Sequence, residues 1–441
     1  MRRQVVKLKV VLALLWQFSQ AQAMGLLEAY EEALRNDPVF RSAVHENEAG
    51  QQSAEIGLSG LLPTLSITHA HGINRGTISQ GGISEPLDFN NEVTTLALRQ
   101  PLLNLEAVAG YRQGIAEANS SQARFAGHTH LLIVRLAEAY FNALLAQDRL
   151  ALANAQRDAL AELKLVNEHM LMRGEGTKTD VLETRSRYAL AQAEVIEAQD
   201  EWEAARLALA TLTGQPVTQL DSLGEAFRAQ PIHPADYESW REMALVRNAE
   251  LVTQRYMVDS SKQEVEKSRS GHAPRVELVA SLSRNNSASF VTADRNARLA
   301  SVGVEVNIPL YAGGRVNAVT SQARANQART EADLDAMTDQ VLLELRRQYQ
   351  LLQSSILRIE SLEIAVESAQ LLVEATEKSI RGGVRINLDL LDAQRQLFSA
   401  QVDLADARYN YLLAYLRLRY AAGTLQLDDL RSISGYFVAS K

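Results

Sequence analysis

The feature that most restricts how this chain can fold is an internal repeat. Sequence landmarks recur in the same order at a spacing of about 210 residues, which indicates a duplicated structural unit. The pairs are Arg35-Asn36 with Arg247-Asn248, Leu62-Pro63-Thr64 with Ala273-Pro274-Arg275, Gln100-Pro101-Leu102 with Ile308-Pro309-Leu310, Tyr140 with Tyr349, and Thr213-Gly214 with Ala422-Gly423. Any fold for this chain must therefore contain the same arrangement twice.

The positions of the prolines set two long helical stretches apart from the rest of the chain. None of the nine prolines falls between Pro101 and Pro216, and none follows Pro309. Residues 107–172 and 317–379 would extend for roughly 95 to 100 Å as helices, longer than a compact core requires. Each is followed by a stretch without Gly or Pro, 181–212 and 388–421. We therefore predict two antiparallel helical hairpins, 107–212 and 317–421.

Apolar residues of the second long stretch recur at steps of four or three, which places them on one helix face. They are Val341, Leu345, Tyr349, Leu352, Ile356, Ile359, Leu362 and Val366. This spacing predicts a coiled-coil seam along the hairpin.

The segments that precede the long helices alternate between apolar and polar residues, which is typical of strands. In the second repeat the alternation covers about 275–283 and 300–310, and in the first, more weakly, about 64–71 and 93–102. Each strand has about ten residues, the length of a tilted membrane-spanning strand. Gly-, Ser- and Asn-rich segments, 72–91 and 284–298, are predicted to be exposed loops between them.

Four strands are too few to close a membrane barrel, because the smallest have about eight and open edges are not tolerated in lipid. The chain is therefore expected to oligomerise. Two copies would give eight strands and a filled interior, whereas three would give twelve strands and room for a lumen. The residues alone favour more than one copy and leave the number open.

The first 23 residues have the pattern of a signal peptide. Arg2, Arg3, Lys7 and Lys9 precede an apolar stretch that ends in a small-residue cleavage site, Ala21-Gln22-Ala23. Removing this segment leaves 41 of the 45 basic residues against 53 acidic residues, a net charge of -12. We therefore expect an exported protein that does not bind nucleic acid.

Two further absences in the sequence narrow the possible classes. No later stretch offers 18 apolar residues without a charge, which argues against a transmembrane helix. The chain also has no cysteine, so disulfides, thiolate metal sites and a lipid-anchoring cysteine are excluded.

The whole pattern resembles the TolC family of outer-membrane factors. The expected organisation is a signal peptide (1–23), a first repeat (24–214), a connecting equatorial segment (215–239), a second repeat (240–423) and a C-terminal tail (424–441). In each repeat a helix precedes the strand pair and the helical hairpin. The second hairpin turn, residues 383–393, is similar to that family's periplasmic gate sequence, and residues 405–411 and 423–425 are similar to further family motifs.

This resemblance implies a mainly α fold with a small β part, in which three chains form a twelve-stranded outer-membrane β-barrel that continues into an α-barrel of helical hairpins. The homotrimer would lie in outer-membrane lipid, extend into the periplasm, and work with a periplasmic adaptor (membrane fusion) protein and an inner-membrane ABC transporter. Many drug-efflux members carry a lipidated N-terminal cysteine, which this chain lacks. We therefore expect an exit duct of type I protein secretion. A multidrug efflux component and a periplasmic coiled-coil scaffold are the alternatives.

The resemblance also assigns roles to residues at the two hairpin turns. Asp389 and Asp392 are three residues apart and so share a helix face, and the family equates them with the selectivity ring of the periplasmic gate. Arg385 would close the gate by bridging to Thr179 and Asp180 of the first turn.

Two observations set limits on this gate assignment. The family usually has an aromatic residue where this chain has Ile380, which supplies no hydroxyl for a gate bond. The alternative to a gate role is helix capping, with Asn387 as N-cap and Asp180, Glu183, Asp389 and Asp392 in first turns, where the helix dipole favours acidic side chains.

We expect neither an enzyme nor a metal or cofactor site. Gly174 to Thr179 lacks the glycine before the lysine of a phosphate-binding loop and is predicted to be a hairpin turn. His69 and His71, like His128 and His130, have a spacing that could bind a metal, but no third ligand lies nearby in the sequence. We expect these histidines to face solvent or a lumen.

Overall fold

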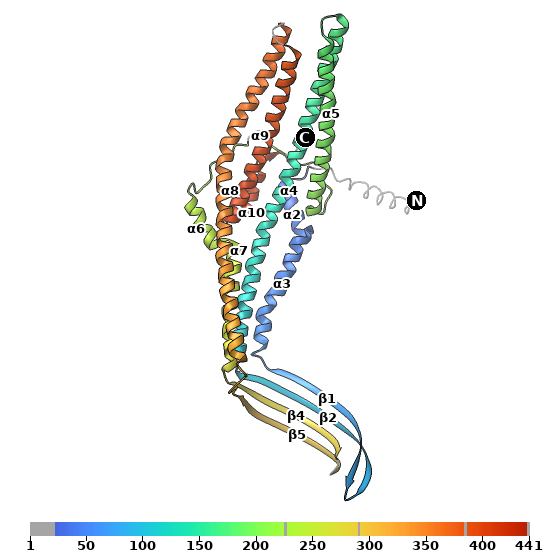
Figure 1. The fold of residues 1–441 in the computed structure, drawn as a ribbon, viewed down its shortest axis with the longest axis vertical. Coiled ribbons are helices and arrows are strands. Elements are labelled where there is room, and N and C mark those ends of the chain that lie inside the picture. Colours follow the sequence, from blue (N-terminus) through green and yellow to red (C-terminus); the bar gives the residue numbers. More distant parts are fainter. Residues whose placement is uncertain (1–22, 225–226, 290–291, 383–385, 439–441) are drawn as a thin grey trace, which may run out of the picture. The chain divides into compact units, whose positions relative to one another are not determined.

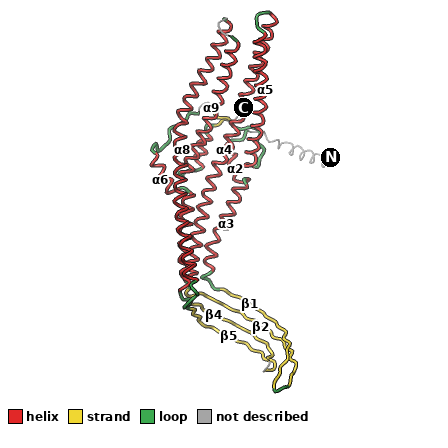
Figure 2. The backbone as a smooth tube through the Cα atoms, viewed as in Figure 1, coloured by secondary structure: helices red, strands yellow, loops and turns green. Residues whose placement is uncertain are grey.

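The computed structural model describes residues 23–224, 227–289, 292–382 and 386–438. All but the last residue of the predicted signal peptide, and Arg385 of the predicted gate, lie outside these ranges. The chain forms two compact units, one of residues 1–44, 126–249 and 338–441 and the other of residues 45–125 and 250–337. Figures 1 and 2 show the elements of both.

Long helices account for most of the chain (Figure 2). The α-helices are α2 (Leu26–Asn36), α3 (Pro38–Ser59), α4 (Leu105–Arg173), α5 (Lys178–Thr213), α6 (Tyr237–Arg247), α7 (Ala249–Arg269), α8 (Arg315–Arg381), α9 (Asn387–Ala421) and α10 (Leu427–Ser434). The strands are β1 (Thr64–Gln80), β2 (Ile83–Leu103), β3 (Ser222–Leu223), β4 (Arg275–Ser289), β5 (Thr292–Asn307) and β6 (Phe437–Val438). Among the described residues, no helix is both long and apolar enough to cross a membrane.

Two helical hairpins are present at the predicted places, α4 with α5 and α8 with α9 (Figure 1). α4 has 69 residues and α8 has 67, as expected for stretches without proline. Asn104 sets the start of α4, because its Oδ1 accepts a hydrogen bond from the backbone N–H of Ala107 at 3.1 Å. Gly214, with φ 69°, ends α5 in the left-handed conformation that favours glycine.

The predicted seam of α8 faces the protein interior. Val341, Leu345, Tyr349, Leu352 and Ile359 are buried. The three remaining residues of the seam are half-buried. The spacing of three and four residues therefore identified the packed face of this helix.

The internal repeat is visible as matching hydrogen bonds. The side-chain amide of Asn36 donates to the carbonyl oxygen of Thr213 at 2.7 Å, and that of Asn248 donates to the carbonyl oxygen of Ala421 at 2.9 Å. Each bond ties a short helix to the end of a hairpin, beside Gly214 in one repeat and Gly423 in the other. A Cβ at Gly423 would lie 2.3 Å from backbone atoms of Arg247, so the glycine permits this close approach. These paired landmarks of the sequence are thus the residues that connect the short helix of each repeat to its helical hairpin.

Four strands form one antiparallel sheet in the order β1-β2-β4-β5 (Figure 1). The strands continue beyond the predicted limits, so the expectation that 72–91 and 284–298 are loops was wrong. Residues 72–80 pair with 83–91 across a two-residue turn formed by Gly81 and Gly82, both with positive φ, and 284–287 pair with 295–298. A Gly-Gly turn of this kind matches the twist of a hairpin and lets the pairing run to its end. β5 also ends at Asn307, before the predicted limit of 310.

The sheet has one apolar face and one polar face. The strand register aligns Leu65, Leu98, Ala280 and Val302 in one row across the four strands. The next row on the same face consists of Ile67, Leu96, Leu282 and Ala300. Several of these apolar side chains are exposed, including Ile67 at 73% and Val302 at 77%. The opposite face carries hydroxyl side chains and a guanidinium. Arg99 there pairs with Glu277 at 3.2 Å and Glu305 at 3.5 Å.

Residues 424–438 of the predicted C-terminal tail contain a helix and a strand that joins the connecting segment. α10 is followed by β6, which pairs antiparallel with β3 of the connecting segment. The ring of Phe437 lies against Tyr140 and Phe141 of α4, with centroid distances of 5.9 Å in both cases. Phe141 also stacks on Tyr409 of α9 at 6.2 Å. These contacts form a hub, defined here as Tyr140, Phe141, Tyr409 and Phe437, where both hairpins and the tail meet.

Candidate functional site at the hairpin turns

The first hairpin turn is held by a capping box at the start of α5. The backbone N–H of Asp180 donates to the Oγ1 of Thr177 at 3.1 Å, and the Asp180 carboxylate accepts from the Thr177 backbone N–H at 3.1 Å. The carboxylate also accepts from the Thr177 hydroxyl at 2.6 Å. Asp180 therefore has a structural role in this turn, and Thr179 is exposed in the first turn of the helix. Residues 174–177 form the turn between α4 and α5, and α5 begins at Lys178, so the predicted hairpin turn is present.

The second hairpin turn places Asp389 in a similar position. Its carboxylate accepts from the backbone N–H of Ile386 at 3.4 Å, and its own N–H donates to the Ile386 carbonyl oxygen at 3.2 Å. Ile386 is the N-cap residue of α9, so the expectation that Asn387 caps this helix was wrong. An isoleucine side chain cannot accept a hydrogen bond, so only the carboxylate half of a capping box is present here.

Asn387 instead takes part in a buried polar cluster that joins the two hairpins. The side-chain amide of Asn167, on α4, donates to the Thr184 hydroxyl at 2.7 Å and to Asn387 Oδ1 at 3.2 Å. The Asn387 amide donates to the same Thr184 hydroxyl at 3.1 Å. Asn167 is 7% exposed and Thr184 is fully buried. We call these three residues the clasp, since they connect α4, α5 and α9 near the turns.

Polar side chains buried in this way are stabilising only while each keeps its partners. The Thr184 hydroxyl accepts from both amides and donates to the Asp180 carbonyl oxygen at 2.8 Å. Separating α9 from the first hairpin would break the two bonds that involve Asn387, each with a net contribution of about 0.5–1.5 kcal/mol, whereas the Asn167–Thr184 bond lies within the first hairpin.

Asp392 forms a second link between the hairpins. Its Oδ1 lies 3.1 Å from the guanidinium of Arg187 on α5, and 3.8 Å from that of Arg395 on its own helix. The Asp392 side chain is 49% exposed and that of Arg187 is 32% exposed. Solvent therefore screens this pair, which is expected to contribute about 1 kcal/mol or less.

Two small apolar clusters pack beside these polar links. Leu160, Ala191 and Leu391 form one cluster between the hairpins. Val373, Leu390 and Ala393 form the other, and Ile380 packs against it. The residue that replaces the family's aromatic side chain thus contributes an apolar contact at the end of α8.

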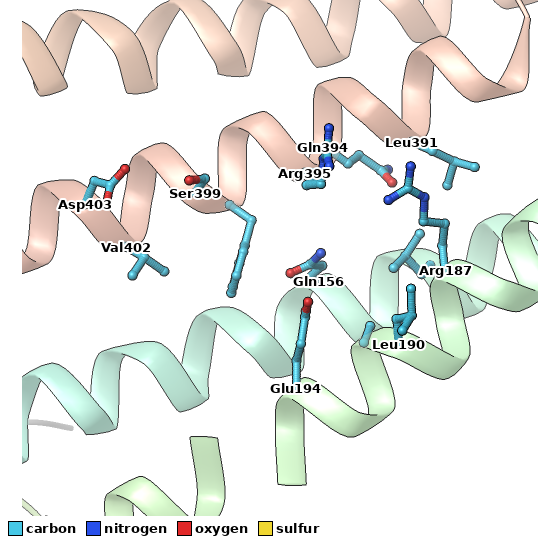
Figure 3. A pocket seen from close by; sticks show the side chains of 13 residues that line it. Gln156, Arg187, Leu190, Glu194, Leu391, Gln394, Arg395, Ser399, Val402 and Asp403 are labelled. Carbon is cyan, nitrogen blue, oxygen red and sulfur yellow. The ribbon is translucent and has the colours of Figure 1, made fainter. Parts of the chain in front are cut away.

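A groove runs between the first hairpin and α9 next to the Arg187–Asp392 pair (Figure 3). Its volume is about 240 Å³. Figure 3 shows Gln156, Glu194 and Arg187 on the helices of the first hairpin, facing Gln394 and Arg395 of α9. The lining combines side chains of both charges with apolar side chains.

A half-buried carboxylate contacts the hub. Asp148 on α4 accepts a hydrogen bond from the Tyr409 hydroxyl at 2.6 Å. Burial raises the pKa of Asp148 above its ordinary value, and the Tyr409 hydrogen bond opposes this rise. Burial and the nearby Asp148 carboxylate also raise the pKa of Tyr409. The tyrosine therefore stays protonated and remains the donor in this pair.

Of the predicted gate residues, the structure places Asp389 and Asp392 in the first turns of α9, and Thr179 and Asp180 in the first turn of α5. The predicted contact of Arg385 with Thr179 and Asp180 lies outside the described residues. The sequence analysis missed Asn167, Thr184 and Arg187. Asn167 and Thr184 are equally distant from the first turn, so the register of an antiparallel hairpin could have paired them.

The described residues contain no group of three or more His, Asp or Glu side chains that could hold a metal ion. His69 is exposed on β1, with its Nδ1 3.0 Å from the Thr94 hydroxyl.

Comparison with known proteins places this chain in a family. The family model described as "Outer membrane efflux protein" matches residues 29–215 and again residues 240–424. The chain belongs to this family. The match confirms the predicted resemblance to the TolC-like outer-membrane factors, and its two copies coincide with the two repeats.

Two relatives and one solved structure illustrate the similarity. The alkaline protease secretion protein AprF of Pseudomonas aeruginosa is 42% identical over 96% of this chain and 89% of its own length. The proteases secretion protein PrtF of Dickeya chrysanthemi is 39% identical over 99% of this chain and 96% of its own length. The outer-membrane channel OprN is 22% identical, with a TM-score of 0.79 over 90% of each chain. The predicted mainly α channel fold and the location in the outer membrane are confirmed.

Proposed function

We propose that this chain is the outer-membrane exit duct of a type I system that secretes a protein, with a protease as the favoured cargo. The observation that carries this proposal is the similarity to AprF and PrtF over nearly the whole chain, since both relatives are named for protease secretion. The duct would receive its cargo from an inner-membrane ABC transporter through a periplasmic adaptor.

The open edges of the sheet support assembly into a trimer. Among the described residues, β1 pairs only with β2 and β5 pairs only with β4, so each edge strand presents unpaired backbone groups. Such groups cannot remain open in lipid. Three copies joined edge to edge would supply twelve strands, with the apolar face toward lipid and the face that carries Arg99 toward the lumen.

The hairpin turns would form the periplasmic gate of this duct. Asp389 and Asp392 would provide the selectivity ring, and Arg385 would bridge to Thr179 and Asp180. The capping role of Asp180 is compatible with this bridge, because a carboxylate has more acceptor sites than the cap uses. The groove of Figure 3 lies next to the gate and is the surface on which we place the adaptor.

Complementation tests the proposal. A Pseudomonas aeruginosa strain that lacks AprF would be given this chain, and alkaline protease would be measured in the culture medium. Restored secretion with no change in drug susceptibility is expected. A gain of drug resistance without secretion would instead identify a multidrug efflux component.

A second measurement separates the duct from a periplasmic scaffold. The duct is expected to need detergent for extraction and to run as a heat-labile trimer on gels. Full solubility without detergent after removal of the signal peptide would reject the duct.

A further inference from the structure

The apolar face of the sheet ends in a row of basic side chains. Beyond Ile67, Leu96, Leu282 and Ala300, the next row on the same face consists of His69, Thr94, Arg284 and Arg298. We call this the basic row. All of its side chains except the half-buried Thr94 are exposed.

The register of the strands sets two positive charges against each other. Arg284 of β4 and Arg298 of β5 are direct partners in the antiparallel ladder. Side chains at such positions have Cβ atoms about 4.5–5.5 Å apart, and like charges there are destabilising. Neither arginine forms an ion pair within the part of the chain that the structure describes. The nearest carboxylate on this face of the described sheet is Glu92, one row further on and opposite Asn286.

Three other arginines, all with described side chains, differ in this respect. Arg99 is paired with Glu277 and Glu305, Arg275 is paired with Glu106, and Arg75 lies 3.7 Å from Asp88. Carboxylates thus neutralise the guanidinium groups elsewhere on the strands. Within the described residues, no carboxylate neutralises the two facing guanidinium groups of the basic row.

The position of the row in the sheet indicates what that partner is. The strands begin beside helix ends at Thr64 and Arg275, and the hairpin turn at Gly81 and Gly82 lies at the opposite end (Figure 1). The basic row lies between the apolar rows and the turns. If the helices are periplasmic, as in the proposed function on which this step rests, the row lies at the level of the headgroups of the outer leaflet.

We propose that the basic row is a binding site for the phosphate groups of lipid headgroups in the outer leaflet. A phosphate between Arg284 and Arg298 would accept hydrogen bonds from both guanidinium groups and remove their mutual repulsion. His69 lies on the edge strand β1, with its Nδ1 3.0 Å from the Thr94 hydroxyl of β2, and extends the site along the row. The adjacent apolar rows would contact the acyl chains of the same lipids. In a trimer this site would occur three times around the barrel.

The test uses the full-length trimer in phosphatidylcholine vesicles, with and without diphosphorylated lipid A. The variant is Arg284→Gln with Arg298→Gln. The control, Arg75→Gln with Arg99→Gln, removes the same charge from two guanidinium groups that already have carboxylate partners. The quantity measured is the temperature at which the trimer dissociates, because a ligand that binds the folded state raises it.

Lipid A is expected to raise this temperature for the wild type and the control. In the variant, the lipid A concentration needed for the same increase should rise about tenfold or more. An equal increase in the variant and the wild type, or equal losses in the variant and the control, would overturn the site. The same increase with inorganic phosphate in detergent would overturn the assignment to a lipid.

Insertion of the wild type into vesicles of phosphatidylcholine alone is measured separately, by resistance to extraction with carbonate. Failure of that step would count against the proposed duct. Insertion without any effect of lipid A would count only against the basic row.

Discussion

Replacement of Thr184 by valine tests whether the clasp holds the hairpin turns together. Valine has nearly the same shape as threonine, so packing at this fully buried position is retained while the hydroxyl is lost. The amides of Asn167 and Asn387 then each lose an acceptor, at 2.7 Å and 3.1 Å respectively. The Asp180 carbonyl oxygen loses a side-chain donor and keeps its place in the helix ladder.

The magnitude follows from those two lost bonds. A buried N–H left without an acceptor costs about 1–3 kcal/mol. The Asn167 amide keeps Asn387 Oδ1 as the acceptor of its other N–H, and Asn387, being half-buried, belongs at the low end of this range because water can reach it. Together, the two unpaired donors should destabilise the closed state by about 2–4 kcal/mol. If opening of the gate lets water reach both amides, this cost falls on the closed state alone, and the ratio of closed to open channels should fall by roughly 30- to 900-fold.

The assay is single-channel recording in planar bilayers, with the fraction of time spent closed as the measured quantity. Thr184→Ser keeps the hydroxyl and should remain close to the wild type. Thr211→Val is the control for loss of a hydroxyl from the same helix, because the exposed Thr211 hydroxyl donates to the Leu207 carbonyl oxygen of that helix. A closed fraction in Thr184→Val equal to that of both controls would refute a role of the clasp in closing the channel.

Three further predictions concern charged groups. Asp389→Ala with Asp392→Ala should lower cation preference and remove block by multivalent cations in bilayers; unchanged selectivity would dismiss the ring. Arg385→Ser should raise the conductance of the closed state, and no increase would remove Arg385 from the gate. Because burial raises the pKa of Asp148 in the folded protein, the folded state binds its proton more tightly than the unfolded chain, and stability falls as pH rises from the unfolded pKa through the folded one. Asp148→Asn, which keeps an acceptor for Tyr409, should therefore raise the melting temperature at neutral pH. Below the pKa of Asp148 in the unfolded chain, the variant and the wild type should melt at the same temperature. An equal difference in melting temperature at neutral pH and below that pKa would contradict the raised pKa of Asp148.

The long elements could be predicted because each has a simple periodic signal. Absence of proline over more than 60 residues leaves few alternatives to helix, and the seam from Val341 to Ile359 repeats at the helical spacing. The residues that connect the short helix to the hairpin in each repeat could also be recognised in the sequence. Asn36 and Gly214 recur as Asn248 and Gly423 because each asparagine amide donates to a carbonyl oxygen at the end of a hairpin and each glycine lies close to the end of the short helix.

The strand lengths were mispredicted because composition was given more weight than turn chemistry. Residues 72–91 are rich in polar residues and glycine, which suggested a loop, but Gly81-Gly82 is a hairpin signal at the centre of the segment. Strand pairing on both sides of that turn satisfies the backbone hydrogen bonds, whatever the side chains are. The polar composition reports only that this end of the sheet meets water.

The clasp was missed for a different physical reason. Its members lie on three helices, and Asn387 belongs to the other repeat, so no local spacing connects it to Thr184. The sequence analysis assigned Asn387 to helix capping because asparagine is common there. Only the packing of one hairpin on the other shows that its amide is used between helices.

The distribution of contacts indicates where the proposed duct opens. At the hub, the aromatic side chains of Tyr140, Phe141, Tyr409 and Phe437 pack together, and Tyr140 and Phe141 are almost fully buried. Near the turns, the hairpins are joined by the clasp, one screened ion pair and two small apolar clusters. Local opening follows the weaker contacts of a structure. Separation of α9 from the first hairpin should therefore stop at the hub, so that an adaptor bound in the groove of Figure 3 has only the turn end of each hairpin to move.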